Sequence, residues 1–172
     1  MCGQLSKDAG EVRINGADQT HAGQDTRYLL GVVFQDSVLD KSLTVRENLK
    51  SRAALYGITG KAFENRLQEL EKLLGFADYT DRAVGKLSGG QRQRVALASI
   101  IVQDPDIIVI DEPTSQLDPK GTEDVFEIIK YLNRQKKTIV LVEHKMNLIA
   151  EYADHIVSVS YTHLTLPTIC SV

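Results

Sequence analysis

The stretch from Gly85 to Asp118 constrains the fold more than any other part of the chain. It begins with Leu-Ser-Gly-Gly-Gln at residues 87–91, and these residues open a helix rich in Ala, Leu and Val. An apolar strand at residues 106–110 follows and ends in two acids, Asp111 and Glu112. Glycines that open a helix and acids that follow a buried strand both recur where proteins bind nucleotide phosphates. The stretch therefore predicts an α/β fold with a nucleotide site.

Strands and helices alternate through the rest of the sequence. Residues 11–16 alternate polar and apolar side chains and close on Asn-Gly, which predicts a strand that enters a hairpin turn. Residues 17–27 are polar and loop-like, and residues 28–34 form the continuous apolar run of a buried strand. This order predicts a parallel sheet that lies between helices. Later strands are expected at residues 138–142 and 155–159, and later helices at about residues 118–132 and 146–152.

Residues from about 40 to 102 have helical patterns only, and we expect them to form a helical subdomain inserted between strands. Thr44 and Glu47 have the spacing of a capping box, which predicts that a helix begins there. A second helix places its apolar side chains on one face and stops at Gly75. These side chains are Phe63, Leu67, Leu70 and Leu74.

Composition limits the classes of function. The chain has 172 residues, a net charge of −3 and a pI of about 5.8, which argues against nucleic acid as a partner. The longest apolar runs have the length of strands, well short of the roughly 20 residues of a membrane helix. Cys2 and Cys170 stand at opposite ends, without metal-ligand spacing, and fit a reducing cytosolic setting.

The segment at residues 87–91 has the chemistry of a phosphate-binding turn. Gly89 and Gly90 let the backbone approach an anion closely, and the helix that follows directs free N–H groups and its positive dipole end toward it. Ser88 adds a hydroxyl donor, and Gln91 adds an amide. The alternative is a flexible Gly-Gly turn before a helix, but Leu-Ser before the glycines and Gln-Arg-Gln-Arg after them favour the phosphate-binding interpretation.

The acidic pair after the strand fits metal-assisted phosphate chemistry. A carboxylate at the end of a parallel strand lies where such sheets bind ligands, so Asp111 is the candidate ligand for Mg²⁺. Glu112 is the candidate general base, which would polarise the attacking water. The alternative is a strand that is followed by an acidic turn.

Three further polar residues stand at the ends of predicted elements. Gln35 follows the apolar run at residues 28–34 and could bind a metal ion or water; the alternative is a polar loop residue. His144 follows the strand at residues 138–142 and could contact a γ-phosphate; the alternative is an exposed His. Asp118 precedes Pro119 at a helix start, where it predicts an N-cap, and a nucleotide-binding role is compatible with that.

In these motifs and their order, residues 10–159 resemble the ATP-binding subunit of an ABC transporter. The resemblance implies a P-loop NTPase-like parallel sheet with an inserted helical subdomain, and the cofactors ATP and Mg²⁺. It implies catalytic roles for Glu112 and His144, metal binding by Asp111 and Gln35, and nucleotide binding by Gln35, Ser88, Gly89, Gly90, Gln91 and Asp118. In the family's terms, residues 87–91 match the signature, 107–112 the Walker B motif, Gln35 the Q-loop, 115–118 the D-loop and His144 the switch histidine.

Parts of the sequence resemble different branches of the family. Residues 31–56 are similar to the ATPases of drug and polysaccharide exporters, and residues 98–159 to those of energy-coupling-factor uptake systems. One hypothesis is therefore a chimeric assembly that joins within the signature region. Residues 160–172 look like translated adapter sequence, so we expect a non-native tail; the alternative is a Thr-rich edge strand.

The family's phosphate-binding loop, Gly-x-x-x-x-Gly-Lys-Ser/Thr, has no match in the sequence. In the family this loop stands upstream of the segment that matches residues 11–16. The expectation is therefore an N-terminally truncated ATPase domain, residues 1–159, that lacks the first strands and the P-loop and is inactive alone.

The function that the resemblance implies is ATP hydrolysis coupled to transport across a membrane. The implied partners are a second ATP-binding domain, paired head to tail in a homo- or heterodimer, and a membrane-spanning subunit that would hold the chain at the cytoplasmic face of the cell membrane. Two alternatives remain open. One is a non-transport ABC-family ATPase, and the other is a silent partner that supplies only its signature in trans.

Overall fold

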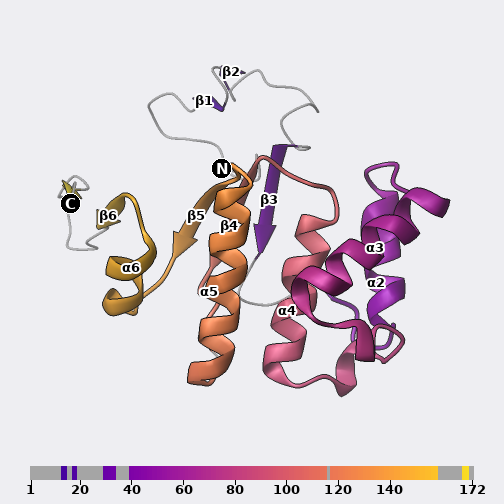
Figure 1. Ribbon diagram of the computed structural model, residues 1–172. Helices are drawn as coiled ribbons and strands as arrows, with labels where there is room; N and C mark the ends of the chain where they lie inside the picture. The colour runs from indigo at the N-terminus through magenta and orange to yellow at the C-terminus, as the bar shows by residue number, and fades with distance from the viewer. Residues whose placement is uncertain are drawn as a thin grey trace. The chain divides into compact units, whose positions relative to one another are not determined.

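The computed structural model describes residues 13–14, 17–18, 29–33, 39–115, 117–158 and 168–170. These belong to two compact units, Met1–Val142 and Glu143–Val172. The strands of the first unit are β1 (Arg13–Ile14), β2 (Ala17–Asp18), β3 (Leu30–Val33), β4 (Ile107–Asp111) and β5 (Thr138–Val142) (Figure 1). Its helices are α2 (Val45–Ala54), α3 (Gly60–Leu74), α4 (Gly89–Ile101) and α5 (Pro119–Arg134), with the 3₁₀ turns η1 (Ala77–Tyr79) and η2 (Val84–Lys86).

Three parallel strands form the sheet of the first unit in the order β3-β4-β5. Val32, Val109 and Val140 lie in one row across it. The parallel sheet expected from the alternation of strands and helices is therefore confirmed. β4 extends one residue further than the sequence predicted and includes Asp111, because Asp111 pairs in register with Val142.

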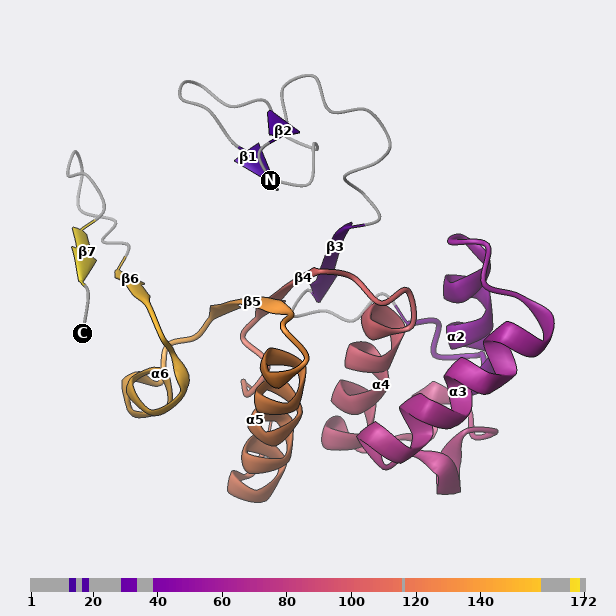
Figure 2. The same ribbon diagram turned by 45° about the horizontal axis from the view of Figure 1, so that its top comes forward.

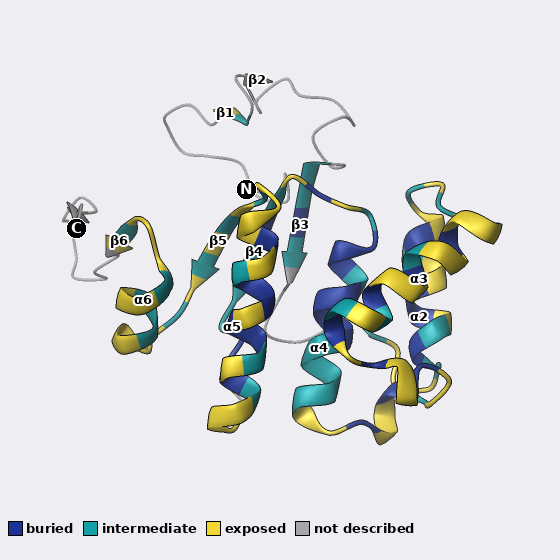
Figure 3. Cartoon of the chain, in the orientation of Figure 1, coloured by how far each residue is buried: buried dark blue, intermediate teal, exposed yellow. Residues whose placement is uncertain are grey.

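Helices α4 and α5 lie on the same side of this sheet in both views (Figures 1 and 2). Ile108 and Ile110 of β4 are buried. The colouring by burial also shows dark-blue, buried positions along α4 and α5 (Figure 3). On the other face, Val140 and Val142 are each 45% exposed. Among the described residues of this unit, the helices thus cover one face, whereas the sequence predicted helices on both.

Gly31 of β3 allows α4 to pack closely against the sheet. A Cβ atom at this position would lie 2.2 Å from Cγ2 of Ile100 and 2.9 Å from Cγ of Pro105. Real Cβ contacts are never this short, because interiors are packed to van der Waals distance. A glycine within a strand often marks such a close approach of another element, as it does here.

Between β3 and β4 the described chain is helical, as the sequence predicted. Thr44 caps α2: its hydroxyl accepts the Glu47 N–H at 3.2 Å, and the Glu47 carboxylate accepts the Thr44 N–H at 2.8 Å. Helix α3 ends at Gly75, whose φ of 63° is the left-handed conformation of a glycine C-cap. The four apolar residues predicted for one face of α3, Phe63, Leu67, Leu70 and Leu74, are all buried.

The predicted hairpin is present, since β1 and β2 pair antiparallel with Ile14 opposite Ala17. The sequence assigned residues 17–27 to a loop, and this was wrong for residues 17 and 18, which form the second strand. A strand of two residues leaves no alternating pattern in the sequence, because its pairing uses only backbone groups.

The second unit contains α6 (Met146–Tyr152), β6 (Ile156–Ser158) and β7 (Thr168–Cys170). Its predicted helix and strand are confirmed. β6 and β7 pair antiparallel, with Val157 opposite Ile169. This pairing agrees with the edge-strand alternative for residues 168–170, and the foreign origin of the tail remains a prediction. Within the described ranges, none of the helices combines the length and apolar character needed to cross a bilayer.

Candidate functional site

Helix α4 begins at Gly89, and the residues of the predicted phosphate-binding turn form its first turn. Ser88 is the N-cap: its hydroxyl oxygen accepts the N–H of Gln91 at 3.3 Å, and the Gln91 side-chain oxygen accepts the N–H of Ser88 at 3.0 Å. This is a capping box, which the sequence analysis missed although Ser-Gly-Gly-Gln has the required spacing. Because the serine hydroxyl only accepts in this box, its hydrogen can be donated to another group.

Gly89 and Gly90 offer backbone N–H groups to an anion. They stand at the first two positions of the helix, where the helix itself provides no acceptor for them. A Cβ atom at Gly90 would have Leu117 Cδ2 as its nearest neighbour, at 3.8 Å, which is ordinary contact. The chain's own packing therefore leaves room for a side chain at Gly90.

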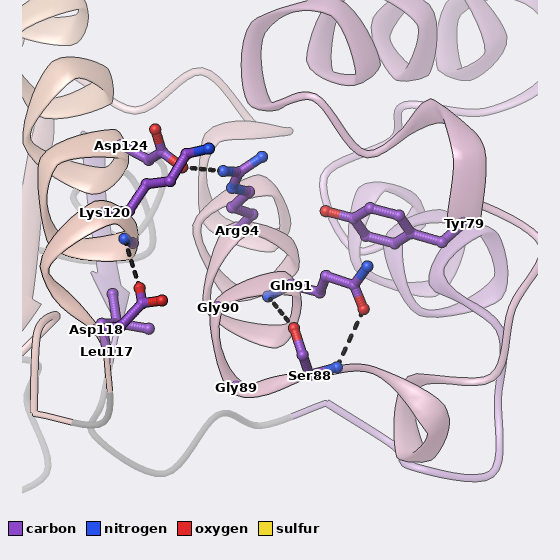
Figure 4. Close-up of a pocket in the computed structure, with 11 residues that line it drawn as sticks. Tyr79, Ser88, Gly89, Gly90, Gln91, Arg94, Leu117, Asp118, Lys120 and Asp124 are labelled. Carbon is purple, nitrogen blue, oxygen red and sulfur yellow. Dashed lines mark hydrogen bonds and ion pairs between the residues drawn. The ribbon is translucent and has the colours of Figure 1, made fainter.

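A cavity of about 530 Å³ opens beside this turn, between α4, α5 and η1 (Figure 4). It brings together residues 88–91 of the predicted signature and Asp118. It also contains residues that the sequence analysis did not identify. The complete lining is Tyr79, Ser88, Gly89, Gly90, Gln91, Arg94, Leu117, Asp118, Lys120, Gly121 and Asp124.

Arg94 crosses this cavity from α4 to α5. Its guanidinium forms an ion pair with the carboxylate of Asp124, and both side chains are about one-third exposed. Its Nη1 lies 3.3 Å from where a Cβ atom at Gly75 would stand. A second cavity, of about 370 Å³, adjoins the same ion pair on the side of α3. The pair thus lies between two cavities.

Tyr79 reaches the cavity from η1 and is 7% exposed. Burial raises the pKa of Tyr79 above its ordinary value, and the positive charge of the nearby Arg94 acts in the opposite direction. The Arg94 guanidinium is a donor beside its hydroxyl oxygen, and no described group accepts its hydroxyl hydrogen. No motif in the sequence pointed to this residue, because the contact depends on how η1 packs beside α4.

Asp118 is the N-cap of α5, as predicted. Its carboxylate accepts the N–H of Gly121 at 2.7 Å. A Cβ atom at Gly121 would stand 2.9 Å from that carboxylate oxygen, so a side chain there would make the Asp118 carboxylate shift. Asp118 also lines the cavity, and a nucleotide-binding role for it stays a prediction.

The acidic pair lies at the end of β4 and does not line the cavity. Asp111 and Glu112 are both half-buried, and the N–H of Glu112 donates to the carbonyl of Val142 at 2.9 Å. The φ of Glu112 is 44°, a left-handed conformation that costs a non-glycine residue about 1–2 kcal/mol. Strained backbone of this kind is frequent at functional sites. No residue pattern in the sequence indicated this conformation.

The remaining candidates cannot be placed beside this pair. Gln35 lies outside the described residues. His144 belongs to the second unit, where its backbone N–H donates to the Glu143 carboxylate at 2.8 Å. In the described ranges no cluster of three His, Cys, Asp or Glu side chains is arranged to hold a metal ion. Asp111 alone would offer Mg²⁺ one carboxylate, which is compatible with the few protein ligands that this ion takes beside substrate phosphates.

The class of protein follows from these features together with the similarity of the chain to known proteins. The profile of the family described as "ABC transporter" matches residues 1–115, which include the first turn of α4 and the acidic end of β4. The chain therefore belongs to the ABC transporter family. Members of this family bind ATP.

Individual relatives agree with this membership. The chain is 36% identical over 154 residues to the methionine import ATP-binding protein MetN 4 of Oceanobacillus iheyensis, an alignment that covers 87% of this chain and 45% of the relative. The chain spans about half the length of the curated relatives it matches.

Two solved structures share the fold. The ATP-binding cassette MJ0796, a dimer bound to ADP and Pi in a post-hydrolysis state, matches with a TM-score of 0.76 and 31% identity, covering 87% of this chain and 68% of that one. The protein cbiO1 from Clostridium perfringens, part of the ABC transporter complex cbiONQ, matches with a TM-score of 0.79 and 25% identity, covering 91% and 64%. This second neighbour fits the expected likeness to energy-coupling-factor ATPases.

Proposed function

We propose that this chain is part of an ATP-binding subunit that couples ATP binding and hydrolysis to transport through a membrane partner. The observation that carries the proposal is the shared cavity of Ser88, Gly89, Gly90, Gln91 and Asp118. The first turn of α4 offers N–H groups, a hydroxyl and a positive helix end at one place, which is the chemistry that a phosphate needs.

In this proposal, the cavity and the acidic pair act on different nucleotides of a dimer. Because Asp111 and Glu112 do not line the cavity, we assign the signature turn to a nucleotide held by a second ATP-binding domain, paired head to tail. The dimeric state of the MJ0796 cassette supports such pairing. A membrane-spanning subunit is the proposed second partner, by analogy with the cbiONQ complex, and it would place the chain at the cytoplasmic face of the membrane.

The acidic pair would serve hydrolysis at the chain's own side of such a dimer. Bound Mg²⁺ would neutralise charge on the phosphates, with Asp111 and Gln35 as the proposed residues that hold it. Glu112 would orient and polarise water, and His144 would help to orient it. The left-handed φ of Glu112 turns the chain sharply directly after β4, which supports a functional role at this position.

An NMR titration of the chain tests the site. We expect ATP and inorganic triphosphate to shift the amide signals of Gly89, Gly90 and Gln91, and adenosine to leave them in place, because the first turn of α4 recognises phosphate. The proposal would be overturned if neither phosphate compound shifts these signals, or if adenosine shifts them as strongly as ATP does.

A further inference from the structure

Tyr79 has a buried hydroxyl whose hydrogen has no acceptor among the described residues. The residue is 7% exposed, and the Arg94 guanidinium beside its hydroxyl oxygen can only donate. Buried polar groups are nearly always hydrogen-bonded, because an unmade bond leaves the cost of desolvation without compensation. The hydroxyl hydrogen of Tyr79 therefore needs an acceptor that the described part of the chain does not supply.

The hydroxyl points toward the cavity beside α4. In Figure 4 it is directed from η1 toward Gln91 and Arg94. Arg94 can only donate hydrogen bonds, and its guanidinium already pairs with Asp124. The side-chain oxygen of Gln91 accepts the N–H of Ser88. The groups beside the phenol thus leave its hydrogen without an acceptor.

The backbone holds Tyr79 firmly in this direction. The N–H of Tyr79 donates to the Phe76 carbonyl at 3.0 Å, and its own carbonyl accepts the N–H of Arg82 at 3.0 Å. Its ring packs against the Phe76 ring with centroids 6.3 Å apart. A donor that is fixed before the ligand arrives loses little entropy on binding, and a hydrogen bond shielded from water is stronger than an exposed one.

We propose that Tyr79 is a further ligand-binding residue of this site, whose hydroxyl donates to a phosphate oxygen of the nucleotide that docks at the first turn of α4. This inference rests on the proposed function, since the ligand is the same nucleotide. A phosphate oxygen suits the position for two reasons. It accepts the phenol hydrogen, and its negative charge is favoured by the α4 N-terminus and the Arg94 guanidinium nearby.

The substitution Tyr79→Phe tests this, because it removes the hydroxyl and keeps the ring that packs against Phe76. We expect the dissociation constant for inorganic triphosphate, from shifts of the Gly89 and Gly90 amides, to rise about tenfold, as for loss of a hydrogen bond to a charged group. The urea concentration at the midpoint of unfolding should stay unchanged or rise, because a buried hydroxyl whose hydrogen has no acceptor has been removed. The matched control is Tyr131→Phe, which removes an α5 hydroxyl outside this cavity and should change neither quantity.

The outcomes separate the inference from the function on which it rests. If the unmodified chain and Tyr79→Phe bind triphosphate equally well, the hydroxyl serves water alone, and the inference is wrong while the proposed site stands. If triphosphate does not shift Gly89 and Gly90 in the unmodified chain, the proposed function fails and the inference fails with it. Weaker binding together with a lower urea midpoint would also contradict it, because the hydroxyl would then be stabilising the fold.

Discussion

A substitution at Gly90 best tests whether the glycines in the first turn of α4 serve ligand binding or the stability of the fold. It stands at the second position of α4, and its φ is outside the positive range that restricts a position to glycine. A methyl group there would meet Leu117 Cδ2 at 3.8 Å, which is unstrained. Replacing a glycine by alanine where the conformation allows it stabilises a protein by about 0.4–1 kcal/mol, because the unfolded chain loses freedom. We therefore expect Gly90→Ala to be stabilised by about 0.5 kcal/mol.

The same methyl group would stand in the cavity beside the N–H groups of the first turn. We expect Gly90→Ala to bind inorganic triphosphate more weakly by about tenfold or more, measured from the amide shift of Gly89, while its urea midpoint rises by about 0.3 M. Gly31→Ala is the contrasting control, because its methyl would clash with Ile100 at 2.2 Å and should cost about 1–3 kcal/mol. A loss of stability in Gly90→Ala of more than about 0.5 kcal/mol would refute the reasoning.

Three further predictions concern the charges and the phenol of the cavity. A double-mutant cycle with Arg94→Gln and Asp124→Asn should give a coupling free energy of unfolding of about 1 kcal/mol. This coupling should fall with added salt, because both side chains are about one-third exposed. A coupling near zero would mean that the ion pair does not tie α4 to α5. Because the folded chain raises the pKa of Tyr79, the stability that this shift contributes is complete below pH 10 and is lost as pH rises through the folded pKa. Absorbance titrations of the unmodified chain and of Tyr79→Phe check this. The ionisation that is lost in Tyr79→Phe should have a pKa above the ordinary value of tyrosine. A pKa at or below that value would contradict the prediction. Asp118→Asn should keep the helix cap but raise triphosphate affinity about threefold, because a negative charge leaves the cavity; unchanged affinity would show that this charge is not felt there.

Local periodicity predicted the elements well, because burial of one face leaves a regular trace in the sequence. The four apolar residues on α3 recur at helical spacing, and all four are buried. The cap of α2 at Thr44 could also be recognised, since its partner Glu47 is three residues away. These features depend on neighbours within one or two turns, which the sequence displays directly.

The candidate site was predictable only in part, because its remaining members come from separate elements. Tyr79 and Asp124 meet α4 through the packing of η1 and α5, and no spacing in the sequence records that contact. The left-handed φ of Glu112 is likewise invisible, since Glu has no preference for this conformation. The capping box of Ser88 could also have been recognised, since Ser88 and Gln91 have the same spacing as Thr44 and Glu47.

The two helices that begin at the cavity differ in what they offer an anion. The positive end of α5 is already offset by the carboxylate of its cap, Asp118. The cap of α4 is the neutral hydroxyl of Ser88, so the positive end of that helix keeps its full attraction for a negative group. Both helices start at the same cavity, yet only α4 also carries glycines in its first two positions. The anion that the cavity selects should therefore lie against α4, within reach of the serine hydroxyl, with α5 forming the opposite wall.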